Sequence, residues 1–262
     1  MTDLKGRTAL VTGSVGGLGY ALAEALAGAG ANVVLNGLAD PAEGAAVAEK
    51  LAAERGVAAA FDPTDLRDVG AIERMVAGTV ERFGSLDVLV NNAVVRHFAP
   101  IEAFTAEAWD RSVSVNLSAA FHAVRCALPH MKRAGWGRIV NLSSYYGFRG
   151  AQNRVDYVTT KTALIGLTRA IAIECARDGV TANAIMPGSV PTEPILTRIE
   201  GIAEERGEPF EDVARAYAEE RSPVGRFIAM ENIGALLVFL CGPAAADITG
   251  TVMPIDGGWL AA

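Results

Sequence analysis

Short apolar runs alternate along the chain with longer stretches of helical pattern, as in a parallel β-sheet whose strands are joined by helices. Seven runs predict strands, over residues 8–12, 31–36, 57–61, 86–90, 138–142, 180–185 and 252–255. Helices are predicted over residues 18–29, from about Pro41, and over residues 117–131 and 156–177. The pattern therefore predicts an α/β fold with helices flanking the sheet.

Residues 191–221 break this rhythm. The segment is rich in Glu and Arg and follows the strand that ends near Pro187-Gly188. We interpret it as a helical excursion over the ligand site rather than an element of the core. Its charges either form a solvated face or belong to a mobile lid.

Composition and charge narrow the class of protein. The 262 residues suit one large α/β domain or two small ones, and a hydrophobic content of 51% can fill a core. The net charge of −7 counts against nucleic acid or an anionic membrane as a partner, because both attract basic surfaces. The chain starts without the apolar stretch of a signal peptide, and its best candidate membrane span, residues 235–241, is too short. We therefore expect a soluble, cytoplasmic protein.

The cysteines and histidines predict no metal site. The three cysteines lie far apart, without the paired spacing of zinc ligands, and are expected to be reduced, buried thiols. The three histidines show no ligand spacing with them. Metal-dependent chemistry is accordingly disfavoured.

A glycine cluster follows the first predicted strand and opens the first predicted helix: Thr12-Gly13-Ser14-Val15-Gly16-Gly17-Leu18-Gly19. Glycine lets the backbone turn sharply and approach a pyrophosphate, whose charge the positive end of the next helix favours. Tight turns need glycine in any case, but this context favours a dinucleotide site. Asn91-Asn92-Ala93 ends the fourth strand at the same edge of the sheet, as a ligand contact or as an ordinary asparagine-capped turn.

The end of the second predicted strand bears on the choice of cofactor. An adenosine 2′-phosphate needs a guanidinium or ammonium group there, and no Lys or Arg occurs between Arg7 and Lys50. The acidic residue that usually binds a free 2′-hydroxyl is also absent. We predict NAD in preference to NADP.

Ser144, Tyr157 and Lys161 form the pattern S-x₁₂-Y-x₃-K, in which the last two lie one turn apart on one helix face. A free tyrosine has a pKa of about 10, too high for acid–base catalysis at neutral pH, and a neighbouring ammonium lowers it. Ser144 can hold the substrate oxygen by a hydrogen bond. An ordinary helix can also contain Y-x₃-K, but its coincidence with Ser144 and the glycine turn argues against chance.

Together these motifs resemble the short-chain dehydrogenase/reductase family over essentially the whole chain. Further matches are Asp65-Leu66-Arg67-Asp68, Asn116, and Pro187-Gly188 with Thr192. The resemblance implies a single Rossmann-type domain with a doubly wound parallel sheet. It also implies hydride transfer between a secondary alcohol and a nicotinamide cofactor, and a homotetramer.

The resemblance assigns roles to individual residues. It implies catalysis by Ser144, Tyr157, Lys161 and Asn116, the last holding a water that links Lys161 to solvent. Asp65 would contact the adenine, Lys161 the nicotinamide ribose and Thr192 the carboxamide. The implied cofactor contacts are Gly13, Gly17, Leu18, Gly19, Asn36, Asp65, Leu66, Asn91, Ala93, Tyr157, Lys161, Pro187, Gly188, Val190 and Thr192.

Within the family, residues 31–37, 116–121 and 256–261 resemble the bacterial NAD-dependent 3-hydroxybutyrate dehydrogenases. That subfamily works without an acidic residue after the second strand, which supports NAD. Trp259 matches a C-terminal segment that reaches a neighbouring subunit's pocket there. It is either a substrate contact or an aromatic residue at a subunit contact.

The predicted substrate pocket departs from that subfamily. Arg96, Tyr146 and Arg154 stand where it has glutamine, histidine and lysine, Ser189 replaces a tryptophan, and Val94 replaces the glycine of the NNAG motif. These replacements leave the chemistry in place but change the groups that would meet the substrate.

Arginine at these positions points to an anionic substrate. A guanidinium binds a carboxylate, sulfonate or phosphate through two hydrogen bonds, and Arg149 is expected near the same pocket mouth. We predict a small anionic hydroxy or keto acid, contacted by Arg96, Ser144, Tyr146, Arg154, Tyr157 and Trp259. Alternatively, the arginines are surface residues paired with the acidic segment 191–221.

Two other functions remain open. A reductase of a neutral ketone or a keto-acyl thioester would share the motifs, although carrier-linked reductases usually use NADPH. A non-catalytic nucleotide-binding regulator would share the fold. Such a protein would be expected to have lost Ser144, Tyr157 or Lys161, and all three are present.

Overall fold

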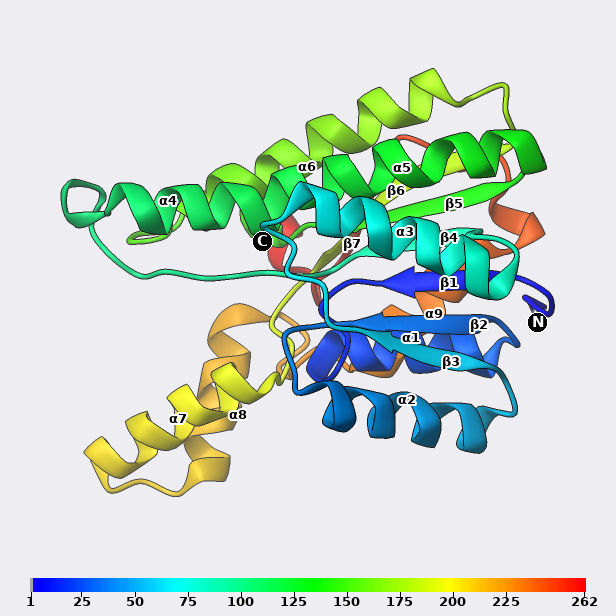
Figure 1. Cartoon of the computed structure of the whole chain (residues 1–262). Helices are drawn as coiled ribbons and strands as arrows, with labels where there is room; N and C mark the ends of the chain where they lie inside the picture. The colour runs from blue at the N-terminus through cyan, green and yellow to red at the C-terminus, as the bar shows by residue number, and fades with distance from the viewer. Residues whose placement is uncertain (1) are drawn as a thin grey trace.

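The computed structural model describes residues 2–262, in which seven strands form one sheet of order β3-β2-β1-β4-β5-β6-β7 (Figure 1). All neighbouring strands run parallel. The seven predicted strands are confirmed, with ends that differ by no more than two residues. Their bounds are β1 (Thr8–Val11), β2 (Asn32–Asn36), β3 (Ala59–Asp62), β4 (Val88–Asn91), β5 (Gly137–Leu142), β6 (Val180–Pro187) and β7 (Val252–Ile255).

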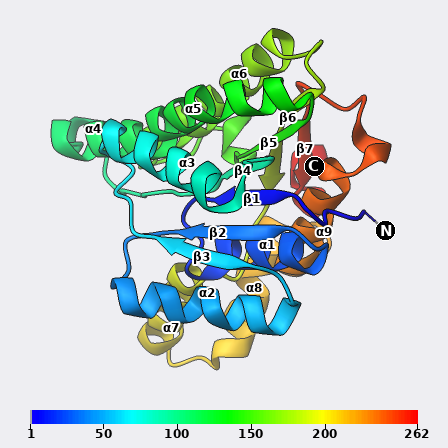
Figure 2. The same cartoon turned by 45° about the vertical axis from the view of Figure 1, so that its right-hand side comes forward.

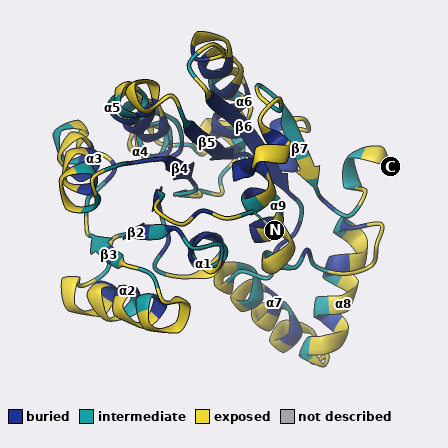
Figure 3. Ribbon diagram, turned by 90° about the vertical axis from the view of Figure 1, so that its right-hand side faces the viewer, coloured by how far each residue is buried: buried dark blue, intermediate teal, exposed yellow. Residues whose placement is uncertain are grey.

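Helices cover both faces of the sheet (Figure 2). One face carries α1 (Gly17–Gly28), α2 (Pro41–Arg55) and α9 (Met230–Cys241), and the other carries α3 (Val69–Phe83), α5 (Ala119–Ala134) and α6 (Val155–Glu174). Each face has its own buried apolar cluster. Figure 3 shows the central strands β4, β5 and β6 buried between these layers and the outer sides of α2 and α3 exposed. The predicted α/β class, with a doubly wound parallel sheet, is confirmed.

The helix predicted over residues 117–131 is part of a longer helical segment. Helix α4 (Ala106–Val113) continues through a π-helical turn, η2 (Ser114–Ser118), into α5. The prediction was wrong about where this segment begins, because apolar periodicity does not register the extra residue of a π turn. None of the helices within residues 2–262 combines the length and apolarity needed to cross a membrane.

Two helices stand apart from the sheet below its carboxyl edge: α7 (Glu193–Arg206) and α8 (Phe210–Arg221) (Figure 1). They pack on each other around a small core of Ile199, Ala203 and Val213. The helical character predicted for residues 191–221 is confirmed. Since this core is separate from the two main clusters, the α7–α8 pair is attached to the sheet mainly through its connecting loops.

Candidate active site

A cavity of about 1570 Å³ opens at the carboxyl edge of the sheet. It lies where the strand order reverses, since β1 is flanked by β2 on one side and β4 on the other. Loops that leave such a point in opposite directions create a crevice. The cavity exceeds the ~300–1,000 Å³ typical of a pocket for one small molecule, so a dinucleotide and a second ligand can share it.

The glycine turn is held in place by Asn92 and Thr12. The Asn92 side chain donates to the carbonyls of Thr12 (3.0 Å) and Gly13 (2.8 Å), and the Thr12 hydroxyl accepts from the main-chain amides of Asn92 (3.0 Å) and Ala93 (3.1 Å). A Cβ at Gly16, the residue that caps α1, would meet no atom within 4 Å. This open, backbone-lined end of α1 fits a pyrophosphate.

Most residues predicted to contact the cofactor are brought together in the cavity wall. They are Gly13, Leu18, Gly19, Asn36, Asp65, Leu66, Ala93, Tyr157, Lys161, Pro187, Gly188, Val190 and Thr192. Gly17 and Asn91 lie outside the lining. The Asn91 amide instead donates to Asn141 Oδ1 (2.8 Å) inside the sheet, because successive strand side chains point in opposite directions. Asn92, not Asn91, faces the cavity.

Asn36 and Asp65 are already engaged by other groups of the chain. The Asn36 amide donates to the carbonyls of Asp62 (3.2 Å) and Thr64 (3.0 Å). Its oxygen accepts from the Gly13 amide (3.4 Å), so the side chain shapes the glycine turn. The Asp65 carboxylate is paired with Arg67, which lowers the pKa of Asp65 below its usual value.

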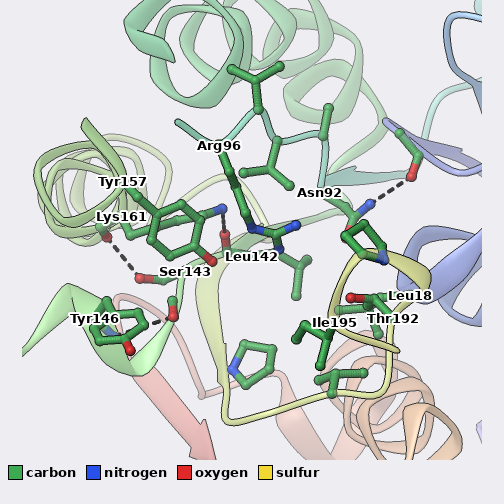
Figure 4. Close-up of a pocket in the computed structure, with 18 of the residues that line it drawn as sticks. Leu18, Asn92, Arg96, Leu142, Ser143, Tyr146, Tyr157, Lys161, Thr192 and Ile195 are labelled. Carbon is green, nitrogen blue, oxygen red and sulfur yellow. Dashed lines mark hydrogen bonds between the residues drawn. The ribbon is translucent and has the colours of Figure 1, made fainter. Parts of the chain in front are cut away.

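The residues of the S-x₁₂-Y-x₃-K motif come together between β5 and α6, and Figure 4 shows Tyr157 and Lys161 beside Ser143. Ser144 follows β5, and Tyr157 and Lys161 lie in the first turns of α6. The Lys161 ammonium donates to the Leu142 carbonyl (2.6 Å), and the Ser143 hydroxyl donates to the Lys161 carbonyl (2.8 Å). These bonds dock the catalytic helix onto the end of β5, with Tyr157 7% and Lys161 2% exposed.

The charges around Tyr157 favour its ionised form. Burial opposes ionisation, but the Lys161 ammonium, the Arg96 guanidinium and hydrogen bonding from Ser144 outweigh it, so the pKa of Tyr157 is lowered. Burial lowers the pKa of Lys161 to about 8, against the opposing influence of Tyr157. Because its pKa is lowered, the Tyr157 hydroxyl can exchange a proton with a substrate closer to neutral pH than a free tyrosine can.

Asn116 lies in the π turn and is buried. Its side-chain oxygen accepts from the Val95 amide (2.8 Å) and its nitrogen donates to the Val95 carbonyl (3.0 Å). The side chain therefore positions the loop after β4, which continues into Arg96. It lies outside the cavity lining.

The predicted substrate residues all line the cavity: Arg96, Ser144, Tyr146, Arg154, Tyr157 and Trp259. Figure 4 shows Arg96 reaching into the cavity between Tyr157 and Ile195. The guanidinium carbons of Arg96 and Arg154 lie 5.5 and 4.4 Å from the centre of the Tyr157 ring. Within residues 2–262, no ion pair joins Arg96, Arg149 or Arg154 to a carboxylate. The alternative that they pair with the acidic segment 191–221 is wrong.

Comparisons with known proteins agree with this geometry. A family profile described as enoyl-(acyl carrier protein) reductase matches residues 13–260. The D-beta-hydroxybutyrate dehydrogenase of Cupriavidus necator is 42% identical over 98% of this chain and 99% of its own. The chain belongs to the short-chain dehydrogenase/reductase family. The predicted family and its oxidoreductase class are thereby confirmed.

Two further proteins place this short-chain dehydrogenase among its relatives. The D-beta-hydroxybutyrate dehydrogenase of Rhizobium meliloti is 42% identical over 97% of this chain and 99% of its own. The solved L-sorbose reductase of Gluconobacter frateurii, in complex with NADPH and L-sorbose, has a TM-score of 0.95 at 27% identity. It covers 100% of this chain and 99% of its own.

Trp259 lies in the cavity of its own chain. Gly257 and Gly258 adopt left-handed conformations (φ 66° and 88°), which turn the chain just before it. The Trp259 ring then lies 6.0 Å from that of Tyr145 and 5.2 Å from the Arg149 guanidinium. From the sequence, Trp259 could also contact a neighbouring subunit. In the structure, the turn at Gly257 and Gly258 brings Trp259 to the cavity of its own chain.

Several lining residues were missed from the sequence, notably Phe98, Arg111, Ile195, Arg198, Tyr217 and Arg221. Some of them carried a signal. Thr192, Ile195 and Arg198 recur at three-residue spacing, which puts them on one face of α7. Charged residues alternate with this face throughout residues 191–221, so the composition of the segment does not separate it from the solvated face.

Proposed function

We propose that this short-chain dehydrogenase interconverts a small anionic hydroxy acid and its keto acid, with NAD as cofactor. The observation that carries the proposal is the pair of unneutralised guanidinium groups, Arg96 and Arg154, against the ring of Tyr157. Guanidinium groups at this place can bind the substrate's carboxylate while its hydroxyl faces Tyr157. The relatives named D-beta-hydroxybutyrate dehydrogenase support it, because that compound is an anionic hydroxy acid.

The proposed chemistry follows from the groups around Tyr157. In alcohol oxidation, the Tyr157 phenolate accepts the proton of the substrate hydroxyl while Ser144 donates a hydrogen bond to the substrate oxygen. Lys161 stabilises the phenolate through its charge. Bound NAD supplies the acceptor for the hydride that leaves the carbinol carbon. In ketone reduction, the Tyr157 hydroxyl donates its proton to the carbonyl oxygen.

We propose that Asn116 takes part in returning the proton to solvent. Both polar atoms of its side chain bond to Val95. The group that holds a water for this relay is therefore its main-chain carbonyl, in the π turn. In this role Asn116 both fixes the loop of Arg96 and connects Lys161 with solvent.

The preference for NAD over NADP rests on the charges near the adenosine end. Two arginines line this end: Arg67 is paired with Asp65, and the charge of Arg111 acts on the same carboxylate. Leu38, which follows β2, is 70% exposed. Neither arginine belongs to the segment after β2, where a 2′-phosphate would need a cation. The NADPH in the L-sorbose reductase complex makes a direct comparison of the two cofactors the necessary measurement.

Three further features belong to this proposal. The α7–α8 pair acts as a lid over the substrate. It has a core of its own, and its residues Arg198 and Arg221 line the cavity. The family resemblance supports a homotetramer, and the charge and patterning of the chain support a cytoplasmic location.

The test is NADH formation with both enantiomers of 3-hydroxybutyrate, neutral alcohols of the same size, and sulfonate and phosphonate analogues. Turnover confined to anionic members is expected. Arg96→Ala and Arg154→Ala should each raise KM by about 10- to 100-fold, because each removes a charged hydrogen-bond donor. Arg206→Ala, an exposed arginine of α7 outside the lining, is the matched control. Turnover of neutral alcohols alone, or unchanged KM in both variants, contradicts the proposal.

A further inference from the structure

The cavity carries far more positive charge than one carboxylate needs. Its lining contains seven arginines and one lysine, with Asp65 as the single carboxylate, in a chain whose net charge is −7. Asp65 is paired with Arg67, and Arg221 with Glu220. A monocarboxylate and the pyrophosphate of a bound dinucleotide together bring about three negative charges, fewer than the five arginines of the lining that no carboxylate of the described residues pairs with.

Arg198 is the informative member of this set, because it comes from α7 and not from the sheet. Within the described part of the chain, no carboxylate forms an ion pair with it. Its guanidinium carbon lies 5.9 Å from the centre of the Phe98 ring. The same ring lies 4.2 Å from the guanidinium of Arg154. Phe98 therefore links the two arginines.

These aromatic contacts orient the guanidinium groups without using their hydrogen-bond donors. A guanidinium over a ring makes contact through its face, and its N–H groups point outward in the plane. Arg154 contacts the rings of both Tyr157 (4.4 Å) and Phe98 (4.2 Å), and its Nε is buried without a hydrogen-bond partner. Burial, and to a smaller extent the neighbouring Arg96 charge, lowers the pKa of Arg154.

The arginines thus fall into two groups according to the aromatic ring that they contact. Arg96 and Arg154 both contact the Tyr157 ring. Arg198 instead contacts the ring of Phe98. The same ring also lies against Arg154, so Phe98 stands between the two groups. A ligand that reaches Tyr157 with its hydroxyl would need a second anionic group, further along its skeleton, to meet Arg198.

We propose that the substrate is a hydroxy acid that carries a second anionic group, and that Arg198 of α7 binds this group. This inference rests on the proposed function and narrows its substrate class from anionic hydroxy acids in general to dianionic ones. The second group is a carboxylate, a sulfonate or a phosphonate/phosphate, all of which offer oxygens to a guanidinium. Because Arg198 belongs to α7, the charge that selects the substrate lies on the proposed lid.

The experiment compares substrates that share a 3-hydroxy acid head and differ at the far end. The probes are 3-hydroxybutyrate, 3-hydroxyglutarate, 3-hydroxy-4-sulfobutyrate and 3-hydroxy-4-phosphonobutyrate, each supplied to the full-length protein with NAD. One charge-assisted contact corresponds to about 10- to 100-fold in kcat/KM, so the best dianion should exceed 3-hydroxybutyrate by at least that factor. Which dianion leads identifies the second group.

Variants of α7 test the assignment to Arg198. Arg198→Ala should reduce the ratio of kcat/KM between the best dianion and 3-hydroxybutyrate by about 10- to 100-fold, and Arg198→Lys should restore part of it. Arg206→Ala, on the same helix but outside the lining, should leave the ratio unchanged.

Other outcomes separate this inference from the proposed function. Turnover of 3-hydroxybutyrate without a preference for any dianion overturns the second-anion proposal alone. A rise in KM for NAD in Arg198→Ala, with an unchanged substrate ratio, also overturns it, because Arg198 would then serve the cofactor. Absence of turnover for every hydroxy acid overturns both.

Discussion

The buried carboxylate of Asp156 accepts a 2.6 Å hydrogen bond from the hydroxyl of Ser112, joining the catalytic helix α6 to α4. The same oxygen lies 3.3 Å from His97 Nδ1, in the loop that carries Arg96. Asp156 directly precedes Tyr157 and lies in the first turn of α6, where the helix dipole favours a negative charge. One carboxylate thus holds together the elements that supply the tyrosine and the arginine of the site.

Asp156→Ala should lower the free energy of unfolding by about 1–3 kcal/mol, because it leaves the buried Ser112 hydroxyl without its acceptor. Asp156→Asn should cost less, since its amide oxygen still accepts that bond. Urea denaturation followed by far-UV circular dichroism measures both. Asp212→Ala, which breaks an exposed ion pair on α8, is the control and should change stability by less than about 0.5 kcal/mol. An alanine variant as stable as the parent would refute the structural role of Asp156.

Gly19→Ala should damage the dinucleotide site. A Cβ at this position would lie 2.0 Å from the Gly13 carbonyl oxygen and 2.6 Å from Asn92 Nδ2, so the glycine turn must move. We expect the Kd for NADH, measured by fluorescence titration, to rise at least about tenfold, which corresponds to loss of roughly one good hydrogen bond. Gly28→Ala at the end of the same helix meets no atom within 4 Å and should bind NADH normally. Normal binding by Gly19→Ala would show that the turn can adjust.

The strands were predictable from the sequence because they are buried on both faces and form short, nearly continuous apolar runs. Helix α3 was overlooked although its caps are present, with Asp68 accepting from the Ala71 amide and Gly84 in a left-handed conformation. Helix α9 was overlooked for a different reason. Its run of residues 235–241 is apolar on nearly every side, so it lacks the helical periodicity that marks a half-exposed helix.

The site was predictable where its residues are close in sequence. Tyr157 and Lys161 lie one helical turn apart, and their shared face follows from helix geometry alone. The contact of Phe98 with Arg154 and Arg198 brings together three separate elements, and no local pattern encodes it. Successive side chains of a strand point to opposite sides, so only one of Asn91 and Asn92 can face the cavity. The sequence does not specify which one does so at the end of a strand.

Tyr157→Phe should lower kcat by about 10²- to 10⁴-fold, because it removes the group that exchanges a proton with the substrate oxygen. The ring that contacts Arg96 and Arg154 remains, so the fold and NADH binding should be retained. Initial rates of NADH formation and the NADH fluorescence titration measure the two quantities. Tyr20→Phe, on α1 outside the cavity lining, is a control that should keep full activity. A Tyr157→Phe variant with a large fraction of parental activity would assign the proton transfer to another residue.

Lys161→Met should move the pH dependence of alcohol oxidation to higher pH. In the proposed reaction the phenolate of Tyr157 accepts the proton, so kcat/KM should rise as pH rises through the pKa of Tyr157, which Lys161 and Arg96 hold below its ordinary value. Without the Lys161 ammonium, less positive charge opposes the effect of burial on Tyr157, so the pKa of Tyr157 increases. Lys161→Arg retains a positive charge and should keep the inflection near that of the parent, even if the Leu142 hydrogen bond is altered. Profiles of kcat/KM from about pH 6 to about pH 10 provide the measurement. An unchanged inflection in Lys161→Met would mean that Arg96 alone supplies the charge that ionises Tyr157.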